Sequence, residues 1–257
     1  MKIVRYCLLC CLLWWAWPAL AQQKVFICGL SDSFPPYQYR GADGQVAGLD
    51  ADVARLVFAR MGQPLVLRMG NFEDLYSALY FGLGVTNGLC GGELTPSRLR
   101  RVLGTQAYFW RRSMIFVRAD GPIRRERDLY GRILVGDADS FVERALGEQL
   151  ARIRLRRGLG QDEGFDLLKQ RKVDAVIAPD YVGRFLARRY GIAVRKLDLG
   201  DPGTPVGFLL PRGETEQRDA INRALRALQA EGRIAEVIRD YFPDDPPSPD
   251  ASAPPAR

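Results

Sequence analysis

The chain has 257 residues, with 37 lysines and arginines against 30 acidic residues, and it contains no histidine. The lack of histidine excludes Ser-His and Cys-His nucleophile systems and histidine-based zinc sites. The basic residues are spread among acids rather than gathered into tracts interleaved with aromatic residues, which argues against nucleic-acid binding. We expect no metal and no other cofactor.

The N-terminus has the pattern of a secretory signal peptide. A short basic start precedes an apolar run over residues 6–17, and residues 19–21 supply the small-residue cleavage pattern. The run is shorter than the roughly 20 residues that span a bilayer. We therefore expect residues 1–21 to be removed on secretion. Lipid attachment at Cys10 or Cys11 is the alternative.

Two cysteines, Cys28 and Cys90, stay in the mature chain. An even pair in an oxidising compartment predicts a single disulfide. Two separate buried thiols are the alternative.

Strand-like and helix-like segments alternate along the mature chain. Apolar segments bounded by turn residues predict strands at 24–30, 64–68, 113–118, 132–135, 173–178, 193–197 and 206–210, and a short apolar segment surrounds Leu89 and Cys90. Helical spacing predicts helices at 50–61, 71–80, 165–169, 181–189, 216–229 and 234–241, with others beginning at Thr95 and near Phe141. This alternation predicts an α/β fold with largely parallel sheets. The tail, 243–257, is expected to be disordered because its composition cannot bury a core.

Polar residues at helix starts predict three caps. Asp50 and Thr95 are each placed to accept hydrogen bonds from the first turn of the helix that follows. Ser140 and Glu143 have the spacing of a capping box.

The order of these segments resembles the periplasmic solute-binding proteins of polar amino acid ABC transporters, which are type-2 periplasmic binding proteins of bacterial extracellular solute-binding protein family 3. The segments that carry the resemblance are SFPPYQYRGADGQVAGLDADVARLVFARMG, LTPSRLRRV followed by AYF, RDLYGRILVG, RKVDAVIA and INRALRALQAEGRIAEVIRDYF. The resemblance runs from about Lys24 to Phe242. The resemblance implies a periplasmic, monomeric protein that binds a small polar or amino-acid-like solute and delivers it to an ABC permease at the inner membrane.

The implied fold has two lobes, each a mostly parallel sheet flanked by helices, with the ligand between them. Lobe 1 would comprise residues 24–116 and 206–242, and lobe 2 residues 117–205. The two hinge crossings would lie near Val117-Arg118 and Thr204-Pro205. Closure of the lobes around a ligand would signal to the transporter.

On lobe 1, the resemblance assigns the ligand's α-carboxylate to Arg98. Thr95 to Arg98 matches the family's T-x-x-R segment, and a guanidinium binds a carboxylate through two parallel hydrogen bonds. The N–H groups at the helix start add to this anion site. The alternative is that Arg98 is a surface arginine like Arg100 and Arg101.

Phe34 lies in the loop where the family places aromatic rings over the ligand. An aromatic ring suits a planar or cationic group. Tyr37, in the same loop, is expected to be structural instead.

Glu93 is the largest departure from the family, which commonly has Ser or Thr there to help hold the carboxylate. A carboxylate at this position repels the ligand's own or neutralises Arg98 in the empty state. The adjacent glycines, Gly91 and Gly92, replace bulkier residues and change the pocket floor. A ligand with a cationic group, or a different polar metabolite, therefore becomes more credible.

On lobe 2, the resemblance points to Ser140 and Asp180. Ser140 could give a hydroxyl to the carboxylate, although Ala138 replaces the family's glycine and Asp139 adds negative charge. Asp180 would bind the ligand's ammonium group, but it lies one residue later than the family's aspartate. Each has a helix-capping alternative.

In this fold the strands that carry Cys28 and Cys90 are neighbours, so the resemblance implies a bond between them. A related subgroup with cysteines in similar places accompanies periplasmic quinoprotein dehydrogenases, which makes an accessory or sensor role one alternative. Cyclohexadienyl dehydratases share the fold and make an enzyme another, with Glu93 and Glu143 as the evident acids. We favour a binding protein without catalytic activity.

Overall fold

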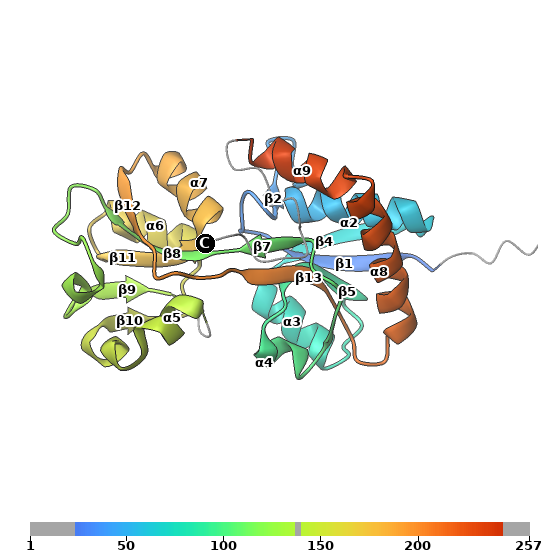
Figure 1. Ribbon diagram of the computed structural model, residues 1–257, viewed down its shortest axis with the longest axis horizontal. Coiled ribbons are helices and arrows are strands. Elements are labelled where there is room, and N and C mark those ends of the chain that lie inside the picture. Colours follow the sequence, from blue (N-terminus) through green and yellow to red (C-terminus); the bar gives the residue numbers. More distant parts are fainter. Residues whose placement is uncertain (1–23, 137–139, 244–257) are drawn as a thin grey trace, which may run out of the picture.

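The computed structural model describes residues 24–136 and 140–243, which form two lobes connected by extended segments (Figure 1). The predicted signal peptide and the tail from residue 244 onward lie outside the described residues. None of the helices in the described ranges is both long and apolar enough to span a bilayer.

The sheet of lobe 1 contains six of the described strands, in the order β4-β1-β5-β13-β6 with β7 paired to β13. These strands are β1 (Phe26–Ser31), β4 (Leu65–Gly70), β5 (Gly88–Glu93), β6 (Leu103–Gly104), β7 (Phe109–Arg111) and β13 (Thr204–Leu210). β1 is parallel to β4 and β5, whereas β13 is antiparallel to β5, β6 and β7. The aromatic loop after β1 forms a small hairpin, β2 (Tyr39–Arg40) and β3 (Val46–Ala47).

The sheet of lobe 2 has the order β10-β9-β11-β8-β12. Its strands are β8 (Ser113–Arg118), β9 (Ile133–Val135), β10 (Arg154–Arg156), β11 (Ala175–Pro179) and β12 (Val194–Leu197). β9 is parallel to β10 and β11, and β8 is antiparallel to β11 and β12. The expectation of parallel sheets thus holds for strands separated by helices. The strands beside the crossings run antiparallel.

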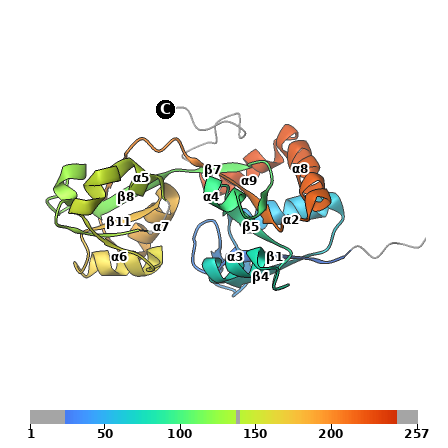
Figure 2. The same cartoon turned by 90° about the horizontal axis from the view of Figure 1, so that it is seen from below.

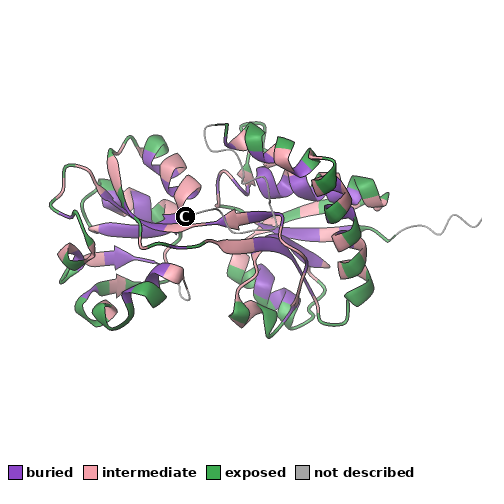
Figure 3. Cartoon of the chain, viewed as in Figure 1, coloured by how far each residue is buried: buried purple, intermediate pink, exposed green. Residues whose placement is uncertain are grey.

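Helices cover both faces of each sheet, so the strands form the buried layer (Figures 1–3). In lobe 1, α2 (Leu49–Met61), α8 (Thr215–Ala230) and α9 (Arg233–Tyr241) lie on one face, and α3 (Phe72–Tyr80) and α4 (Pro96–Leu99) on the other. In lobe 2, α5 (Phe141–Leu146) lies on one face, and α6 (Gln161–Lys169) and α7 (Asp180–Tyr190) on the other. Two 3-10 turns, η1 (Glu126–Leu129) and η2 (Gly147–Arg152), complete the elements of lobe 2.

The predicted helices and strands are confirmed to within a few residues, but the short strands β2, β3 and β6 were not predicted, and three further differences stand out. β10 was not expected because its arginines give no apolar run. α6 begins at Gln161, before the predicted helix at residue 165. α2 begins at Leu49 after Gly48, so Asp50 is not its cap and lies inside the helix.

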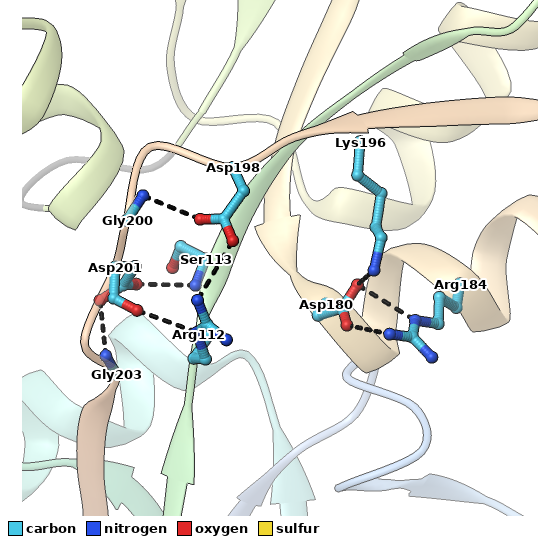
Figure 4. Close-up of polar contacts among 9 residues, drawn as sticks. All are labelled: Arg112, Ser113, Asp180, Arg184, Lys196, Asp198, Gly200, Asp201 and Gly203. Carbon is cyan, nitrogen blue, oxygen red and sulfur yellow. Dashed lines mark hydrogen bonds and ion pairs between the residues drawn. The ribbon is translucent and has the colours of Figure 1, made fainter. Parts of the chain in front are cut away.

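The first crossing lies earlier than expected. The apolar strand β8 pairs with β11 from Ser113 to Val117, so it belongs to lobe 2 along its length. The chain therefore leaves lobe 1 at Arg112 rather than near Val117-Arg118. The return runs through residues 198–203, and Asp201 binds it to the first crossing. The Ser113 N–H donates to the Asp201 carboxylate at 2.7 Å, and Arg112 Nε donates to the Asp201 carbonyl at 2.9 Å (Figure 4).

The predicted disulfide is confirmed. Cys28 and Cys90 are bonded across the neighbouring strands β1 and β5, with a Cα–Cα distance of 5.8 Å. Both residues are buried in the main core of lobe 1. The bond closes a loop of 62 residues.

We predict that replacing both cysteines, as in C28A/C90A, lowers the free energy of unfolding by about 2–4 kcal/mol. Without the bond, the unfolded chain has more conformational entropy. Urea titration of both forms measures the loss. Alkylation of the unreduced wild type should detect no free thiol in the mature chain. A double variant as stable as the wild type would contradict the prediction.

Candidate functional site

The carboxyl ends of the parallel strands in the two lobes face the crossings. In lobe 1, Glu93 at the end of β5 pairs with Val206 near the start of β13. In lobe 2, Pro179 at the end of β11 pairs with Ser113, directly after the first crossing. In open α/β sheets, ligands bind outside the carboxyl ends of the strands. The candidate site is therefore the region between the lobes, lined by the residues that follow these strand ends.

The residues predicted to form an anion site in lobe 1 lie around α4. Thr95 caps this one-turn helix, since its hydroxyl accepts a bond from the Arg98 N–H at 3.4 Å. The Arg98 guanidinium lies 4.7 Å from the centre of the Phe72 ring on α3. It donates to the Glu93 carbonyl at 3.3 Å. Arg98 is thus oriented by backbone and by an aromatic face, with 23% of its side chain exposed.

Glu93 lies beside Arg98 in this structure. Their charged groups are 4.0 Å apart, and the exposed Glu73 approaches Arg98 at the same distance. Partial exposure keeps such pairs weak, at about 0–1 kcal/mol. The structure thus places Glu93 next to Arg98, and its effect on ligand binding stays a prediction.

Lobe 1 also contains a buried ionic network that the sequence analysis missed. Arg111 on β7 donates to Asp50 on α2 at 2.5 Å and to the Gly91 carbonyl at 3.0 Å. Asp50 also accepts bonds from Tyr108 at 2.7 Å and from Gln38 at 2.6 Å. Burial raises the pKa of Asp50, while the Arg111 guanidinium opposes this shift. Burial likewise raises the pKa of the Tyr108 hydroxyl, so it remains a neutral donor.

Phe34 lies over this network. Its ring centre is 5.0 Å from the Arg111 guanidinium and 5.6 Å from the Tyr37 ring. Tyr37 is only 1% exposed and packs in the core, as expected for a structural residue. Phe34 is half-buried and therefore presents part of its ring at the surface. One face of the Phe34 ring is thus already covered by the Arg111 guanidinium.

The glycine at position 91 is required by the network. Gly91 has φ of +75°, and a Cβ on it would lie 2.1 Å from the Asp50 carboxylate. The Asp50 side chain therefore fills the space that a larger residue would take in the pocket floor. At Gly92, a Cβ would meet the Leu209 side chain at 2.5 Å.

In lobe 2, the capping role of Ser140 is confirmed. Its hydroxyl accepts a bond from the Glu143 N–H at 3.1 Å at the start of α5. The Glu143 carboxylate is held by Arg157, at 3.2 and 3.3 Å. Ala138 and Asp139 lie outside the described residues.

Asp180 is the first residue of α7, and the cap position is Pro179, so the capping alternative for Asp180 is wrong. Its carboxylate makes two bonds to Arg184, at 2.5 and 3.1 Å, and one to Lys196 on β12 at 2.9 Å (Figure 4). Its N–H donates to the Arg112 carbonyl at the first crossing. Asp180 therefore lies at the predicted strand end, but with two cations already bound.

The lobes also touch through aromatic rings. Tyr181 on α7 stacks on Phe242, with ring centres 3.7 Å apart. Phe242 follows α9 and packs on Phe109 in lobe 1. A second contact joins Tyr39 of the hairpin to Phe185 of α7, with ring centres 6.4 Å apart.

Two further site residues give weak sequence signals. Arg111 occurs in FWRRS, where either arginine could be a surface residue, and Lys196 follows another basic residue, Arg195, in the strand VRKL. Residues 94–119 contain no aspartate or glutamate. A buried arginine in this segment therefore needs a carboxylate from elsewhere in the chain, and this is the sequence signal that could have pointed to the network. Among the described residues, no group of three or more acidic or cysteine side chains is arranged to hold a metal ion.

Comparison with known proteins identifies the class. The model of the bacterial extracellular solute-binding proteins, family 3, matches residues 26–244, and the chain belongs to this family. One relative is the ABC transporter arginine-binding protein 1 of Escherichia coli K12, which is 22% identical over 231 residues, 88% of this chain and 93% of that protein.

Two solved structures show the same fold. An ancestral arginine-binding protein bound to glutamine has a TM-score of 0.76 at 23% identity, covering 85% of this chain and 97% of that one. A histidine kinase sensor domain similar to periplasmic binding proteins has a TM-score of 0.77 at 20% identity, covering 86% of this chain and 97% of that domain.

We predict that Gly91→Ala destabilises the protein far more than Gly44→Ala. Both glycines have nearly the same φ, +75° and +76°, but a Cβ at Gly44 meets nothing within 4 Å. Gly44→Ala should therefore cost only the left-handed backbone penalty of about 1–2 kcal/mol. Gly91→Ala must in addition displace the Asp50 carboxylate from Arg111. Urea denaturation of the two variants measures the difference, and equal losses would show that the Asp50 contact is not limiting.

Proposed function

We propose that this protein binds a small polar or amino-acid-like solute between its two lobes in the periplasm and delivers it to an ABC permease. Membership of the solute-binding family over residues 26–244 carries the proposal. The candidate site agrees with it, because both lobes place charged side chains and helix starts at facing strand ends. The arginine named for the Escherichia coli relative makes amino acids the first ligands to test.

In the proposed site, Arg98 binds a ligand carboxylate, with Thr95 holding the helix start in place. Phe34 covers the ligand from the first loop. Ser140 and Asp180 approach from lobe 2 as the lobes close. A ligand shifts the equilibrium toward the closed form to the extent that it binds the closed form more tightly than the open form.

The proposal treats the protein as a binder rather than an enzyme. The two carboxylates that could serve a dehydratase are engaged by arginines, Glu93 by Arg98 and Glu143 by Arg157. Each of these carboxylates thus has an arginine of its own lobe as a neighbour, which supports binding over catalysis.

A sensory or accessory role is a second candidate function. The similarity to a histidine kinase sensor domain supports it, because that domain also has this two-lobed fold. Such a protein would present its closed form to a receptor or a dehydrogenase instead of a permease. Genes beside this one separate the roles: a permease and ATPase pair supports transport, and a quinoprotein dehydrogenase supports the accessory role.

We predict that a thermal-shift screen of amino acids, polyamines and organic acids identifies a ligand, because a ligand that binds only the folded state raises the melting temperature. Arg98→Ala should weaken binding of any carboxylate ligand about 10- to 100-fold, through loss of charge-assisted hydrogen bonds. Arg101→Ala is the matched control, since Arg101 also packs over a ring of α3 without lying beside Glu93. Unchanged affinity in the Arg98 variant would remove this residue from the site.

We predict that Glu93→Gln strengthens binding of carboxylate ligands up to about fivefold, because the variant keeps the size of the side chain and removes a weak competing ion pair. Titration calorimetry with the ligand found in the screen measures the change. Weaker binding in Glu93→Gln would instead show that Glu93 contacts a cationic group of the ligand.

A further inference from the structure

Several exposed apolar side chains of the described residues lie together at the C-terminal end of α3. Of the seven large hydrophobic residues that are strongly exposed in the described ranges, four lie between residues 80 and 99. Tyr80 ends α3, and Phe81 and Leu83 lie on the turn that follows it, with 44%, 71% and 68% exposure respectively. The Tyr80 and Phe81 rings contact each other, with centres 4.8 Å apart.

The backbone of this turn presents the two outermost side chains to solvent. Gly82 and Gly84 both have positive φ, and a Cβ on either would meet nothing within 4 Å. Phe81 and Leu83 therefore stand on a protruding tip rather than in a groove.

Three arginines contact either the tip or a residue close to it, and they lack a carboxylate partner among the residues that the structure describes. Arg101 lies 5.5 Å from the Tyr80 ring centre. Arg68 donates to the Val85 carbonyl at 2.7 Å, in the loop that leaves the tip. Arg212 donates to the carbonyls of Arg100 and Arg101.

The segments that carry the tip and Arg101 have no acidic residues, whereas Glu214 and Glu216 follow Arg212. Residues 75–92 and 94–119 contain no aspartate or glutamate. The surface therefore combines a hydrophobic tip with positive charge. We name it the tip surface, formed by Tyr80, Phe81, Leu83, Arg68, Arg101 and Arg212.

We propose that the tip surface binds the face of a lipid bilayer that contains anionic lipids. Phe81 and Leu83 would enter the boundary between headgroups and acyl chains, as apolar side chains do at membrane interfaces. The three arginines would bind lipid phosphates, and each basic residue near an anionic surface adds to the attraction. A stable protein–protein interface buries about 800 Å² per partner. Three apolar side chains on a protruding turn offer much less, which favours a shallow, reversible membrane contact.

Such a contact goes beyond solute binding and does not involve the residues proposed for the ligand. It would hold lobe 1 near the membrane and orient the space between the lobes relative to it. Because arginine–lipid attraction is screened by salt, the binding must weaken as ionic strength rises.

Sedimentation of the mature full chain with vesicles tests the proposal. Vesicles of phosphatidylethanolamine and phosphatidylglycerol should bind the protein at least about tenfold more tightly than vesicles of phosphatidylcholine alone. High salt should abolish the difference. The variant F81S/L83S should lose binding to both kinds of vesicle. The variant R68Q/R101Q/R212Q should lose the preference for anionic vesicles.

The control V25S/Y130S removes two exposed hydrophobic residues that lie elsewhere and should bind like the wild type. In F81W, the tryptophan emission should shift to shorter wavelength on mixing with anionic vesicles, which reports insertion directly. Failure of the wild type to sediment with anionic vesicles would overturn the proposal. Binding unchanged in F81S/L83S would overturn it too. Capture of a detergent-solubilised permease through the same residues, without vesicle binding, would assign the tip surface to a protein partner instead.

Discussion

The ion pair between Asp50 and Arg111 joins the parts of lobe 1 from which the candidate site is built. Asp50 comes from α2, Arg111 from the last strand before the first crossing, and the Gly91 carbonyl from the end of β5. Both charged side chains are at most 3% exposed. A buried pair of this kind is costly to desolvate and is tolerated only where further hydrogen bonds complete it. Tyr108 and Gln38 supply those bonds.

Removal of one partner from such a pair leaves an uncompensated buried charge, at a cost of about 3–5 kcal/mol. The network therefore constrains its neighbours strongly. Position 91 must be glycine because the Asp50 carboxylate occupies the space beside it. Phe34 rests on the Arg111 guanidinium, so the ring proposed to cover the ligand takes its place from the same pair. The glycine at position 91 and the position of Phe34 thus both depend on the Asp50–Arg111 pair.

The sequence predicted the fold well because the fold depends on signals that are local and periodic. The apolar spacing of α2, α3 and α8 and the strand SMIFVR are visible without tertiary contacts. The site was harder to predict because its important contacts join residues far apart in the chain. Asp50 and Arg111 are 61 positions apart, and neither has a local pattern that distinguishes a buried charge from a helix cap or a surface arginine. Where prediction used a local rule, it succeeded for Thr95 and Ser140 and failed for Asp50.

Aromatic packing extends the influence of this network to the contact between the lobes. Phe34 packs on Tyr37, Tyr37 on Phe109, and Phe109 on Phe242, with ring centres 5.6 to 5.7 Å apart at each step. Phe242 in turn stacks on Tyr181 of lobe 2.

An aromatic pair is worth about 0.5–1.5 kcal/mol beyond its buried area. Any separation of the lobes at α7 must break the last step of this series, while the other steps stay within lobe 1. In this series it is therefore the Phe242–Tyr181 pair that contributes directly to the free energy that holds the lobes together.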